Sequence, residues 1–311
     1  MTSAQRKWKQ AKRRKELLSC LGVHTLGDCD AILTVAMPLF RAGPIAWVAL
    51  ESLIRQTGIN FKWELVAAEE VCAKGYKNVS PLGFAKLSEY FDKLKKVGCC
   101  RLVYIGLDHW VPLGDKWVLI ATYASKSSKV FSLQSADCWS GPERLVLNKQ
   151  LLWQPPKNYF SWTHGVHHVL YDIVTGKSVI YTISKPKSEA GCDMALRTDI
   201  VRKMPIDHRR KGVDTWLMDN CVKMLGSNRF SVAVDDSKGW RSSMNVHGIN
   251  NISSRRSIFF KNGATNKKNL RVRIKLDPNI RKFIPAFVFK RLEKLKNKAK
   301  RWGKRPWGKG Q

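Results

Sequence analysis

The sequence contains few acidic residues: 24 Asp and Glu stand against 56 Lys and Arg, which leaves a net charge of +32. The basic excess is concentrated at the two ends of the chain. Residues 1–15 hold seven basic and no acidic residues, and residues 253–311 hold 20 basic and two acidic residues. A mildly basic body with two strongly basic ends indicates a polyanionic partner, either the phosphates of a nucleic acid or an anionic membrane surface.

Cysteine motifs are also missing: the eight cysteines include no CxxC motif and do not have the spacing of a zinc site. The N-terminus has no apolar segment typical of a signal peptide, and no run approaches the roughly 18 apolar residues of a membrane span. No internal repeat is found, and only the basic ends have low complexity. We therefore expect eight free thiols, a reducing environment and a cytoplasmic location.

The chain is long and apolar enough for a substantial core. Its 311 residues, 44% of them hydrophobic, suffice for one large α/β domain or two smaller ones. A buried strand is predicted at 31–39 and a helix at 45–57 that Gly58 ends. A second strand is predicted at 63–70, so this part forms a right-handed βαβ unit.

The alternation of strands and helices continues. Apolar residues from Phe84 to Val97 recur at spacings of three and four, which predicts one helix closed by Gly98. The later predicted elements are a strand at 101–105, a helix at 116–125 and a strand at 130–133. Together the units predict a doubly wound parallel sheet.

The stretch VFSLQSADCWSGPERL at 130–145 organises the rest of the chain. A short apolar run, typical of a strand in a parallel sheet, is followed by a single carboxylate, Asp137. Ligands of open α/β sheets bind beyond the carboxyl ends of the strands, which makes Asp137 the candidate centre of a site. The alternative is that Asp137 serves only as a turn residue or helix cap.

These segments resemble one family. LTVAMPLFRAGP, ALESLIRQT and WELVAAEE are similar to the first strand and loop, first helix and second strand of family-2 glycosyltransferases of the GT-A fold. VFSLQSADCWSGPERL lies where that family has its Asp-x-Asp motif and a Pro-Glu-Arg-Leu turn. The resemblance covers roughly residues 31–252 and is strongest at 32–70 and 130–145.

The resemblance implies an α/β, Rossmann-like GT-A domain, with a mostly parallel sheet and flanking helices. It implies a nucleotide-sugar donor such as a UDP-sugar, a divalent metal (Mn²⁺ or Mg²⁺) bridging its diphosphate, and transfer of the sugar to a hydroxyl. The implied donor-binding residues are Pro38, Phe40, Glu69, Lys116, Ser135, Ala136 and Asp137.

Two positions depart from the family pattern. The first acidic position of the Asp-x-Asp motif is Ser135, which leaves Asp137 as the one carboxylate for the metal. Mg²⁺ and Mn²⁺ favour oxygen ligands and retain waters, so one carboxylate and the donor phosphates can suffice. The second strand ends in Glu69 and Glu70 in place of aspartates. Glu69 matches the residue that accepts a hydrogen bond from the nucleobase, and the alternative is an ordinary exposed carboxylate.

The segment 194–221 resembles the acceptor side of the family. There Asp214 matches an acidic residue that opens a helix after a glycine-containing loop. An inverting transfer needs a carboxylate to take the proton of the acceptor hydroxyl, which implies Asp214 as general base and Asp207 as its substitute. The alternative is that Asp214 is only a helix N-cap.

Histidines supply the remaining ligand candidates. His247 lies where many GT-A enzymes have a late histidine that binds metal or pyrophosphate, and the alternative is a loop histidine. His164, His167 and His168 form a helix-like HxxHH pattern without a nearby Cys or Glu, which is weak support for zinc. We interpret these three as part of an acceptor-side loop.

The C-terminal part combines an alternating strand at 270–276 with a basic amphipathic helix whose apolar stripe starts at Val288. The helix could lie on an anionic bilayer, or it could pack its stripe on the body and present its cations to nucleic acid. The predicted contact residues are Arg271, Arg273, Lys275, Arg291, Lys294, Lys298 and Trp302.

We therefore expect a basic N-terminal arm at 1–30, a GT-A domain at 31–252 and a basic C-terminal extension at 253–311. The basic ends favour a DNA acceptor, as in the similar bacteriophage enzymes that glycosylate hydroxymethylated pyrimidines. One alternative is a membrane-associated enzyme of envelope or capsule glycan synthesis. The other is a non-catalytic nucleic-acid-binding protein. No protein partner is inferred.

Overall fold

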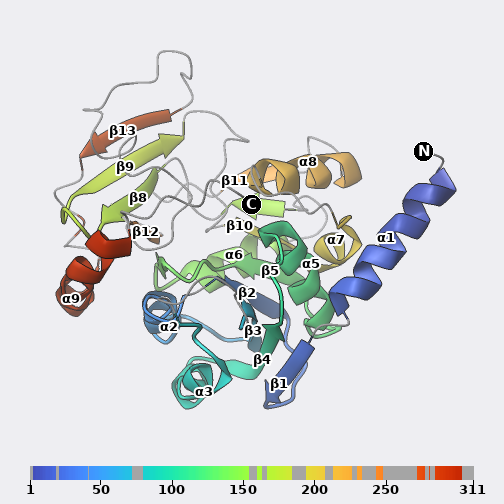
Figure 1. The fold of residues 1–311 in the computed structure, drawn as a ribbon, viewed down its shortest axis with the longest axis horizontal. Helices are drawn as coiled ribbons and strands as arrows, with labels where there is room; N and C mark the ends of the chain where they lie inside the picture. The colour runs from blue at the N-terminus through green and yellow to red at the C-terminus, as the bar shows by residue number, and fades with distance from the viewer. Residues whose placement is uncertain are drawn as a thin grey trace.

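The structure, a computed structural model, is organised around two β-sheets (Figure 1). An eight-stranded sheet has the order β1-β4-β3-β2-β5-β10-β7-β11, and a five-stranded sheet has the order β13-β9-β8-β12-β6. The residues that the structure describes are 3–18, 21–40, 42–71, 80–153, 160–162, 167–183, 194–206, 213–225, 230–232, 243–247, 272–276, 280 and 284–302.

Four neighbouring strands of the large sheet are parallel. They are β4 (Cys99–Leu107), β3 (Trp63–Glu70), β2 (Leu33–Leu39) and β5 (Val130–Leu133). Helices cover both faces of these strands, so their residues are almost all buried, and this explains the continuous apolar runs in the sequence. The four strands predicted from the sequence are confirmed, with β4 longer than expected at both ends.

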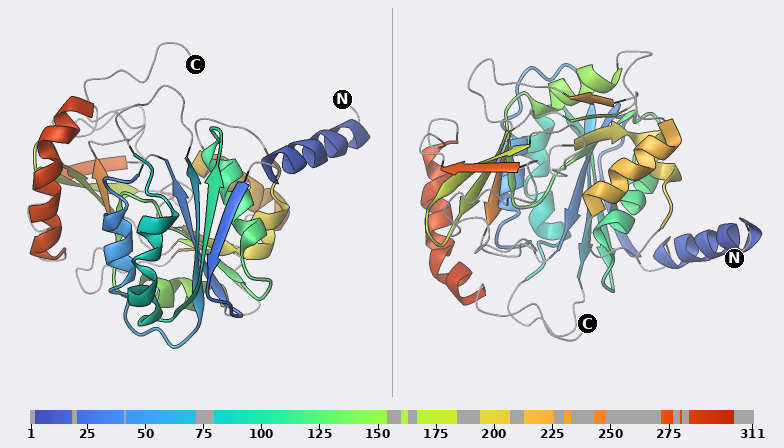
Figure 2. Two further views of the ribbon diagram at one scale, coloured as in Figure 1. Left: turned by 60° about the horizontal axis from the view of Figure 1, so that its bottom comes forward. Right: turned by 90° about the horizontal axis from the view of Figure 1, so that it is seen from above.

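Alternate residues of each parallel strand point to two different cores. Val35 and Met37 of β2 belong to the core beneath α2 (Trp47–Leu53), α3 (Phe84–Ser88), α4 (Phe91–Lys95) and α6 (Arg144–Trp153). Ala36 belongs to the core beneath α5 (Leu113–Tyr123), α7 (Thr198–Lys203) and α8 (Val213–Leu225). Helices therefore lie on both sides of the sheet (Figure 2), and the expected α/β, Rossmann-like architecture is confirmed.

The helix predicted at 84–97 is two short helices, α3 and α4, separated by a turn at 89–90. Gly98 follows with a φ of 87°, and a Cβ there would lie 2.9 Å from the Ile59 side chain. The chain therefore needs glycine at the point where it enters β4. The helix predicted at 45–57 is also shorter, because turns occupy 43–46 and 54–55.

The outer strands make the large sheet mixed. The strand β1 (Leu21–Leu26) is antiparallel to β4, β10 (Met194–Arg197) is antiparallel to β5 and β7 (Phe160–Trp162), and β11 (Phe230–Val232) is parallel to β7. The sheet is therefore mixed, with the mostly parallel centre that we expected. The prediction that the N-terminal arm extends to residue 30 is wrong, because residues 21–26 form β1, which is hydrogen-bonded into the sheet.

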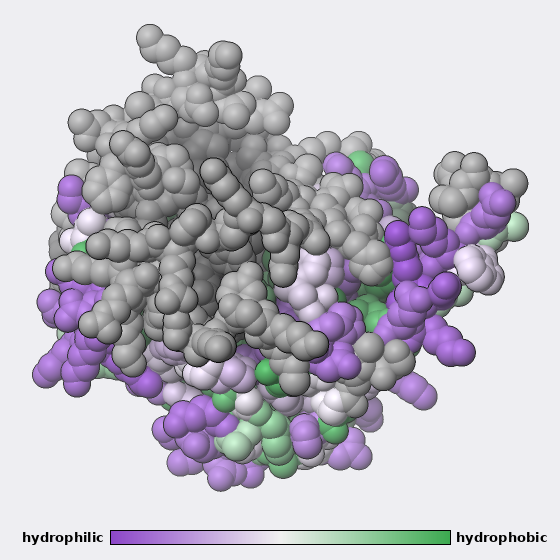
Figure 3. Space-filling model, in the orientation of Figure 1, coloured by the Kyte–Doolittle hydropathy of each residue, from purple (hydrophilic) through white to green (hydrophobic). Residues whose placement is uncertain are grey.

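The basic N-terminus is the helix α1 (Ser3–Leu18), which projects from the body at one end and is strongly hydrophilic (Figures 1 and 3). Its inner half is fixed to the segment after α7. The Gln10 amide exchanges hydrogen bonds with the backbone of Ile206, at 3.0 and 2.8 Å, and Arg13 donates to the same carbonyl at 3.2 Å. Leu17 is buried in the adjacent core. The basic N-terminal arm is therefore a helix whose inner half is docked on the body.

The second sheet joins distant parts of the chain. It contains β6 (Cys138–Ser140), β8 (His167–Asp172), β9 (Ser178–Ile183), β12 (Ser243–His247) and β13 (Val272–Leu276). Backbone pairing of β13 with β9 confirms the strand predicted at 270–276 over residues 272–276 and makes it part of this sheet. The boundary expected at residue 252 therefore does not separate a C-terminal extension from the body.

The C-terminal helix α9 (Ala286–Trp302) packs its apolar stripe on the body. Val288 and Leu292 are fully buried in the core that also contains α2, and Phe289 makes an edge contact with Tyr171, 5.2 Å between ring centroids. Of the two interpretations of this helix, packing on the body is the one that these residues support. None of the helices in the described ranges has the length and apolar composition of a membrane span.

One pair of cysteines is joined. Cys29, in the loop after β1, forms a disulfide with Cys100 of β4, with 5.9 Å between their Cα atoms. The antiparallel pairing of β1 with β4 brings the two residues together. The expectation of eight free thiols is therefore wrong for this pair.

Cys99 and Cys221 are buried thiols, and burial raises the pKa of each to about 12 from an ordinary value of 9.0. We expect neither to react with iodoacetamide in the native protein at pH 8, and both to react in denaturant, because the thiolate is the reactive form. Peptide mass spectrometry after labelling measures this, and rapid native labelling of either would contradict it.

The same shift has a consequence for stability. The unfolded chain releases these protons at lower pH than the folded chain, so the stabilisation is complete below pH 9 and decreases as the pH rises toward 12. The Cys221→Ala variant should lose less stability than the parent protein over that interval in chemical denaturation.

Candidate active site

The point where the strand order reverses lies between β2 and β5. The chain passes from β2 to β3 and β4 on one side and returns to β5 on the other side of β2. Loops that leave neighbouring strands in opposite directions create a crevice at the carboxyl ends of those strands, where open α/β sheets bind ligands. The residues that follow β2, β3 and β5 are therefore the candidates for a site.

Asp137 lies in the turn directly after β5, at this switch point. Three backbone hydrogen bonds fix the turn: Gln134 N to Ala36 O at 2.9 Å, Cys138 N to Ser135 O at 3.2 Å, and Val246 N to Asp137 O at 2.9 Å. Asp137 is partly exposed, as Ser135 is. The turn is therefore held between β2 and β12 while the carboxylate remains accessible.

Buried polar side chains form hydrogen bonds with residues on both sides of this turn. Arg144 is 1% exposed and donates to the Gln134 Oε1 at 2.6 Å, to the Ser140 hydroxyl at 2.6 Å and to the carbonyl of Leu133. The amide of Gln134 donates to Cys138 O at 2.8 Å. Arg144 belongs to the Pro-Glu-Arg-Leu turn, but no pattern in the sequence indicated that it fastens the Asp137 turn.

Lys116 lies at the same edge but is 3% exposed. Its ammonium donates to the Glu70 Oε2 at 2.6 Å and to the carbonyl of Leu39 at 2.7 Å, and it lies 5.6 Å from the ring centroid of Phe40. Burial lowers the pKa of Lys116, and the charge of Glu70 opposes that shift. Lys116 thus ties α5 to the ends of β2 and β3, and its direct contact with a donor remains a prediction.

Glu69 is fully buried, so the alternative of an exposed strand-end carboxylate is wrong. It accepts hydrogen bonds from the backbone N–H groups of Leu82 and Gly83, at 2.7 and 2.8 Å, and from the Tyr104 hydroxyl at 2.9 Å. Burial raises the pKa of Glu69, while these hydrogen bonds act against the shift. Glu69 therefore fixes the segment that enters α3, and its predicted contact with a nucleobase remains a prediction.

The other predicted donor-binding residues lie at the same edge. Pro38 and Phe40 are half-buried at the end of β2, and Ala136 lies in the Asp137 turn with 8% of its surface exposed. The structure thus brings all seven predicted donor-binding residues to the carboxyl edge of β2, β3 and β5, or to the first turn of α5.

The two more distant candidates approach this edge through their backbones. Asp214 is the second residue of α8, whose first turn packs on α5: a Cβ at Gly114 would lie 3.0 Å from the Trp216 ring and 3.3 Å from Val213. His247 ends β12, one residue after Val246, which donates to Asp137 O. The side chains of Asp214 and His247, and all of Asp207, lie outside the described residues.

The HxxHH segment is not the loop that we expected. His167 and His168 begin the strand β8, where they pair with Thr182 and Tyr181 of β9. His164 lies outside the described residues. Within the described ranges no group of three or more His, Cys, Asp or Glu side chains is arranged to hold a metal ion.

The predicted polyanion contacts are divided between β13 and α9. Arg273 and Lys275 pair with Thr182 and Ile180 of β9 through their backbones. Arg291 and Lys294 are exposed on α9. Lys298 and Trp302 also belong to α9, but their side chains, and all of Arg271, lie outside the described residues.

Comparison with known proteins finds no matching family model and no matching curated protein. Solved structures do match. One is TarS from S. aureus, residues 1–349, in complex with UDP-GlcNAc, at 12% identity over 70% of this chain and 59% of that chain, with a TM-score of 0.46. Another is the mannosyltransferase PcManGT from Pyrobaculum calidifontis in complex with GDP-Man and Mn²⁺, at 11% identity over 79% of this chain and 65% of that chain, with a TM-score of 0.48.

A third is glucosyl-3-phosphoglycerate synthase from M. tuberculosis, at 10% identity over 73% of this chain and 75% of that chain, with a TM-score of 0.42. This chain spans 37% of the full TarS chain and 59–60% of its 1–349 form. At such identities and scores the matches do not decide a function. The function must therefore be inferred from the site of the chain itself.

Proposed function

We propose that this protein is a glycosyltransferase that moves a sugar from a nucleotide-sugar donor to a hydroxyl acceptor. The observation that carries the proposal is the place of Asp137: a partly exposed carboxylate on a fixed turn, at the switch point between β2 and β5. The sequence resemblance to the GT-A glycosyltransferases assigns the same residue to the donor diphosphate. Geometry and sequence pattern thus point to one position.

On the donor side, the chain would bind the nucleotide over the ends of β2 and β3 and the diphosphate over the Asp137 turn. Pro38 and Phe40 would contact the nucleoside, while Glu69 keeps the neighbouring segment in place through Leu82 and Gly83. The buried Lys116 would place a positive charge behind the diphosphate, and its salt bridge with Glu70 would reduce the potential of that charge. These contacts would therefore hold the binding edge in place before the donor binds.

The same edge would hold a divalent cation. Its protein ligands would be Asp137, which is partly exposed, and His247, the last residue of the adjacent β12. Mg²⁺ or Mn²⁺ accepts such a small protein ligand set when phosphate oxygens and waters complete its coordination. Held there, the cation would neutralise charge on the departing diphosphate.

The acceptor hydroxyl needs a base on the side opposite the diphosphate. Asp214 is our candidate, because the start of α8 packs against the first turn of α5, which also carries Lys116. A carboxylate that takes the hydroxyl proton contributes about 10²–10⁴-fold to the rate. Asp207 is the substitute candidate.

For the acceptor we propose DNA that carries hydroxymethylated pyrimidines. Support comes from the charge of +32 and from α1, a basic helix that projects from the body. A membrane-associated enzyme is less well supported, because Val288 and Leu292 of α9 are buried against the body and are not available to a bilayer. The enzyme would reach the base hydroxyl in the major groove or after flipping the base.

A screen of nucleotide-sugars with modified and unmodified duplex DNA tests the function. We expect nucleotide release with one donor and a sugar-modified nucleoside, detected by mass spectrometry, only with hydroxymethylated DNA. In that assay Asp214→Asn should reduce transfer by about 10²–10⁴-fold and leave DNA retention unchanged. The matched control is Asp219→Asn, an exposed carboxylate of the same helix, which should keep full activity.

Other outcomes separate the alternatives. Turnover with a glycan or lipid acceptor, together with sedimentation on anionic vesicles, would overturn the DNA acceptor but keep the transferase. Steep salt-dependent retention of DNA without turnover of any donor would overturn the transferase and favour a nucleic-acid-binding protein. Equal activity of Asp214→Asn and the parent protein would remove Asp214 from the site.

A further inference from the structure

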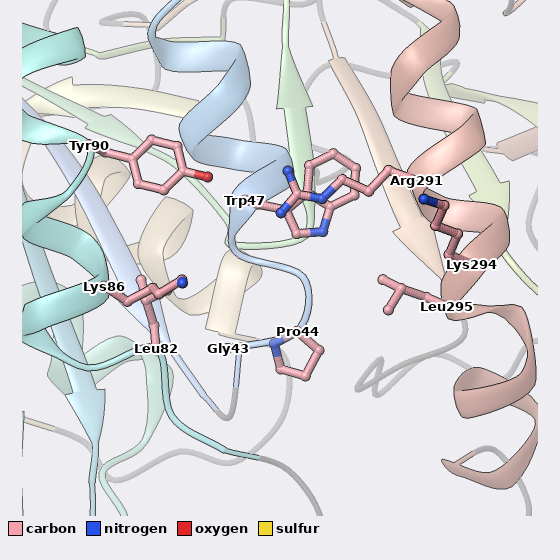
Figure 4. Close-up of a pocket in the computed structure, with 9 residues that line it drawn as sticks. All are labelled: Gly43, Pro44, Trp47, Leu82, Lys86, Tyr90, Arg291, Lys294 and Leu295. Carbon is pink, nitrogen blue, oxygen red and sulfur yellow. The ribbon is translucent and has the colours of Figure 1, made fainter.

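A groove lies between α2, α3 and α9, outside the residues to which we assign sugar transfer. Its volume is about 350 Å³, within the range of roughly 300–1,000 Å³ that is common for ligand sites. Three cationic side chains, Lys86, Arg291 and Lys294, line it (Figure 4). No carboxylate is among the described residues that line it, so the groove favours an anion.

Arg291 is held in place before any ligand binds. Its guanidinium stacks over the ring of Trp47, at 4.2 Å from the ring centroid. A guanidinium has five N–H donors in a rigid plane, and stacking through its face leaves the N–H groups at its edge for a ligand. This edge of Arg291 is suited to the paired oxygens of a phosphate.

Two carboxylates near the groove residue Tyr90 do not cancel the charge of the groove. Glu51 is engaged by Arg55 at 2.5 Å. Glu89 lies 3.5 Å from Lys86, but both side chains are more than 60% exposed, and such pairs are weak. A positive potential therefore remains over the groove.

The groove lies beside the candidate active site. Gly43 and Pro44, in its wall, follow the end of β2, and Leu82 donates its backbone N–H to Glu69 at the end of β3. Leu295 closes the wall from α9. A ligand that occupies the groove would thus extend toward the edge of the sheet where we propose transfer.

We propose that this groove binds a phosphate group of a phosphodiester chain. A polymer is favoured over an isolated phosphate because α9 carries a further exposed cation, Lys290, one turn before Lys294. Each phosphate that a cation neutralises adds a counterion-release term, which rewards a ligand with regularly spaced charges. The inference rests on the proposed function only in treating the phosphodiester polymer as the acceptor of the sugar. Binding of the polymer is measured without a nucleotide-sugar donor.

The test compares two double variants with the same loss of charge. Arg291→Gln with Lys294→Gln removes two cations of the groove, and Lys126→Gln with Lys129→Gln removes two exposed cations before β5, at the opposite edge of the sheet. The probes are a fluorescent single-stranded oligonucleotide and an abasic oligomer of equal length, titrated from 50 to 200 mM salt. We expect the groove variant alone to lower the slope of log K against log salt by about 1.4, roughly 0.7 for each cation removed, for both probes.

A second measurement locates the binding. Inorganic phosphate should shift the indole N–H resonance of Trp47, assigned with Trp47→Phe, in the parent protein and not in the groove variant. An equal loss of slope in the two double variants, or an unmoved Trp47 signal, would overturn the site. Loss for the oligonucleotide alone would also overturn it, because the bases and not the phosphodiester chain would then be bound. A confirmed site in a protein that transfers no sugar would refute the proposed function only.

Discussion

The Asp137→Asn variant should lose at least about 100-fold in kcat/KM for sugar transfer, with its folding unchanged. The substitution keeps the size of the side chain and removes the charge at the point where we propose that the donor diphosphate binds. Charge stabilisation at a prepared site is commonly worth about 10²–10³-fold. The turn itself should persist, because its hydrogen bonds run through backbone atoms and through Gln134 and Arg144. Steady-state kinetics and chemical denaturation measure the two effects.

The matched control is Glu143→Gln, which removes an exposed carboxylate from the following turn. Because it changes the net charge by the same amount, it separates the site from a general effect on binding of anionic donors. We expect it to retain full activity. If Asp137→Asn and Glu143→Gln proved equally active, Asp137 would have no part in the reaction.

The Glu70→Gln variant should lose about 3–5 kcal/mol of unfolding free energy. Glu70 and Lys116 form a salt bridge of 2.6 Å with both side chains nearly inaccessible, and removing one partner leaves an uncompensated buried charge. Adding Lys116→Met should restore most of the loss, because an apolar side chain of similar length needs no partner. A double-mutant cycle from urea denaturation gives the coupling.

The pH dependence of the Glu70→Gln variant has a definite sign. Burial already lowers the pKa of Lys116, and without Glu70 it should fall further. The unfolded chain then binds the proton more tightly than the folded chain, so stability rises with pH up to the ordinary lysine pKa of 10.5. The defect should therefore be smaller at pH 9 than at pH 7.

Glu89→Gln is the control for this prediction, because it breaks an exposed pair with Lys86 and should change stability by no more than about 0.5 kcal/mol. Equal effects of the two substitutions would mean that the Glu70–Lys116 pair is not buried in solution.

The parallel strands could be predicted because burial on both faces leaves a direct trace in the sequence. LTVAMPL is apolar at all positions but one, and WELVAAEE contains the apolar run LVAA; they became β2 and β3. The position of Asp137 followed from the same logic, since a strand of this kind delivers the next residues to the edge of the sheet. Glycines at positive φ, such as Gly98, also marked where elements end.

What could not be predicted depends on contacts between distant segments. The strand β1 has the mixed sequence LGVHTL, and its place beside β4 is set by pairing and by the Cys29–Cys100 disulfide. Similarly, His167 and His168 looked like part of a loop, because nothing local shows that they pair with Thr182 and Tyr181 of β9. The burial of Glu69 and the role of Arg144 arise from tertiary hydrogen bonds that no local pattern encodes.

The backbone bond from Val246 to Asp137 joins the Asp137 turn to a strand far downstream in the chain. During synthesis the parallel strands from β2 to β5 therefore emerge before β12, the strand that fixes the turn. Closing so long a loop costs chain entropy, which the contacts of β12 must offset. A chain still emerging from the ribosome would thus hold the Asp137 turn without this support until synthesis has passed β12.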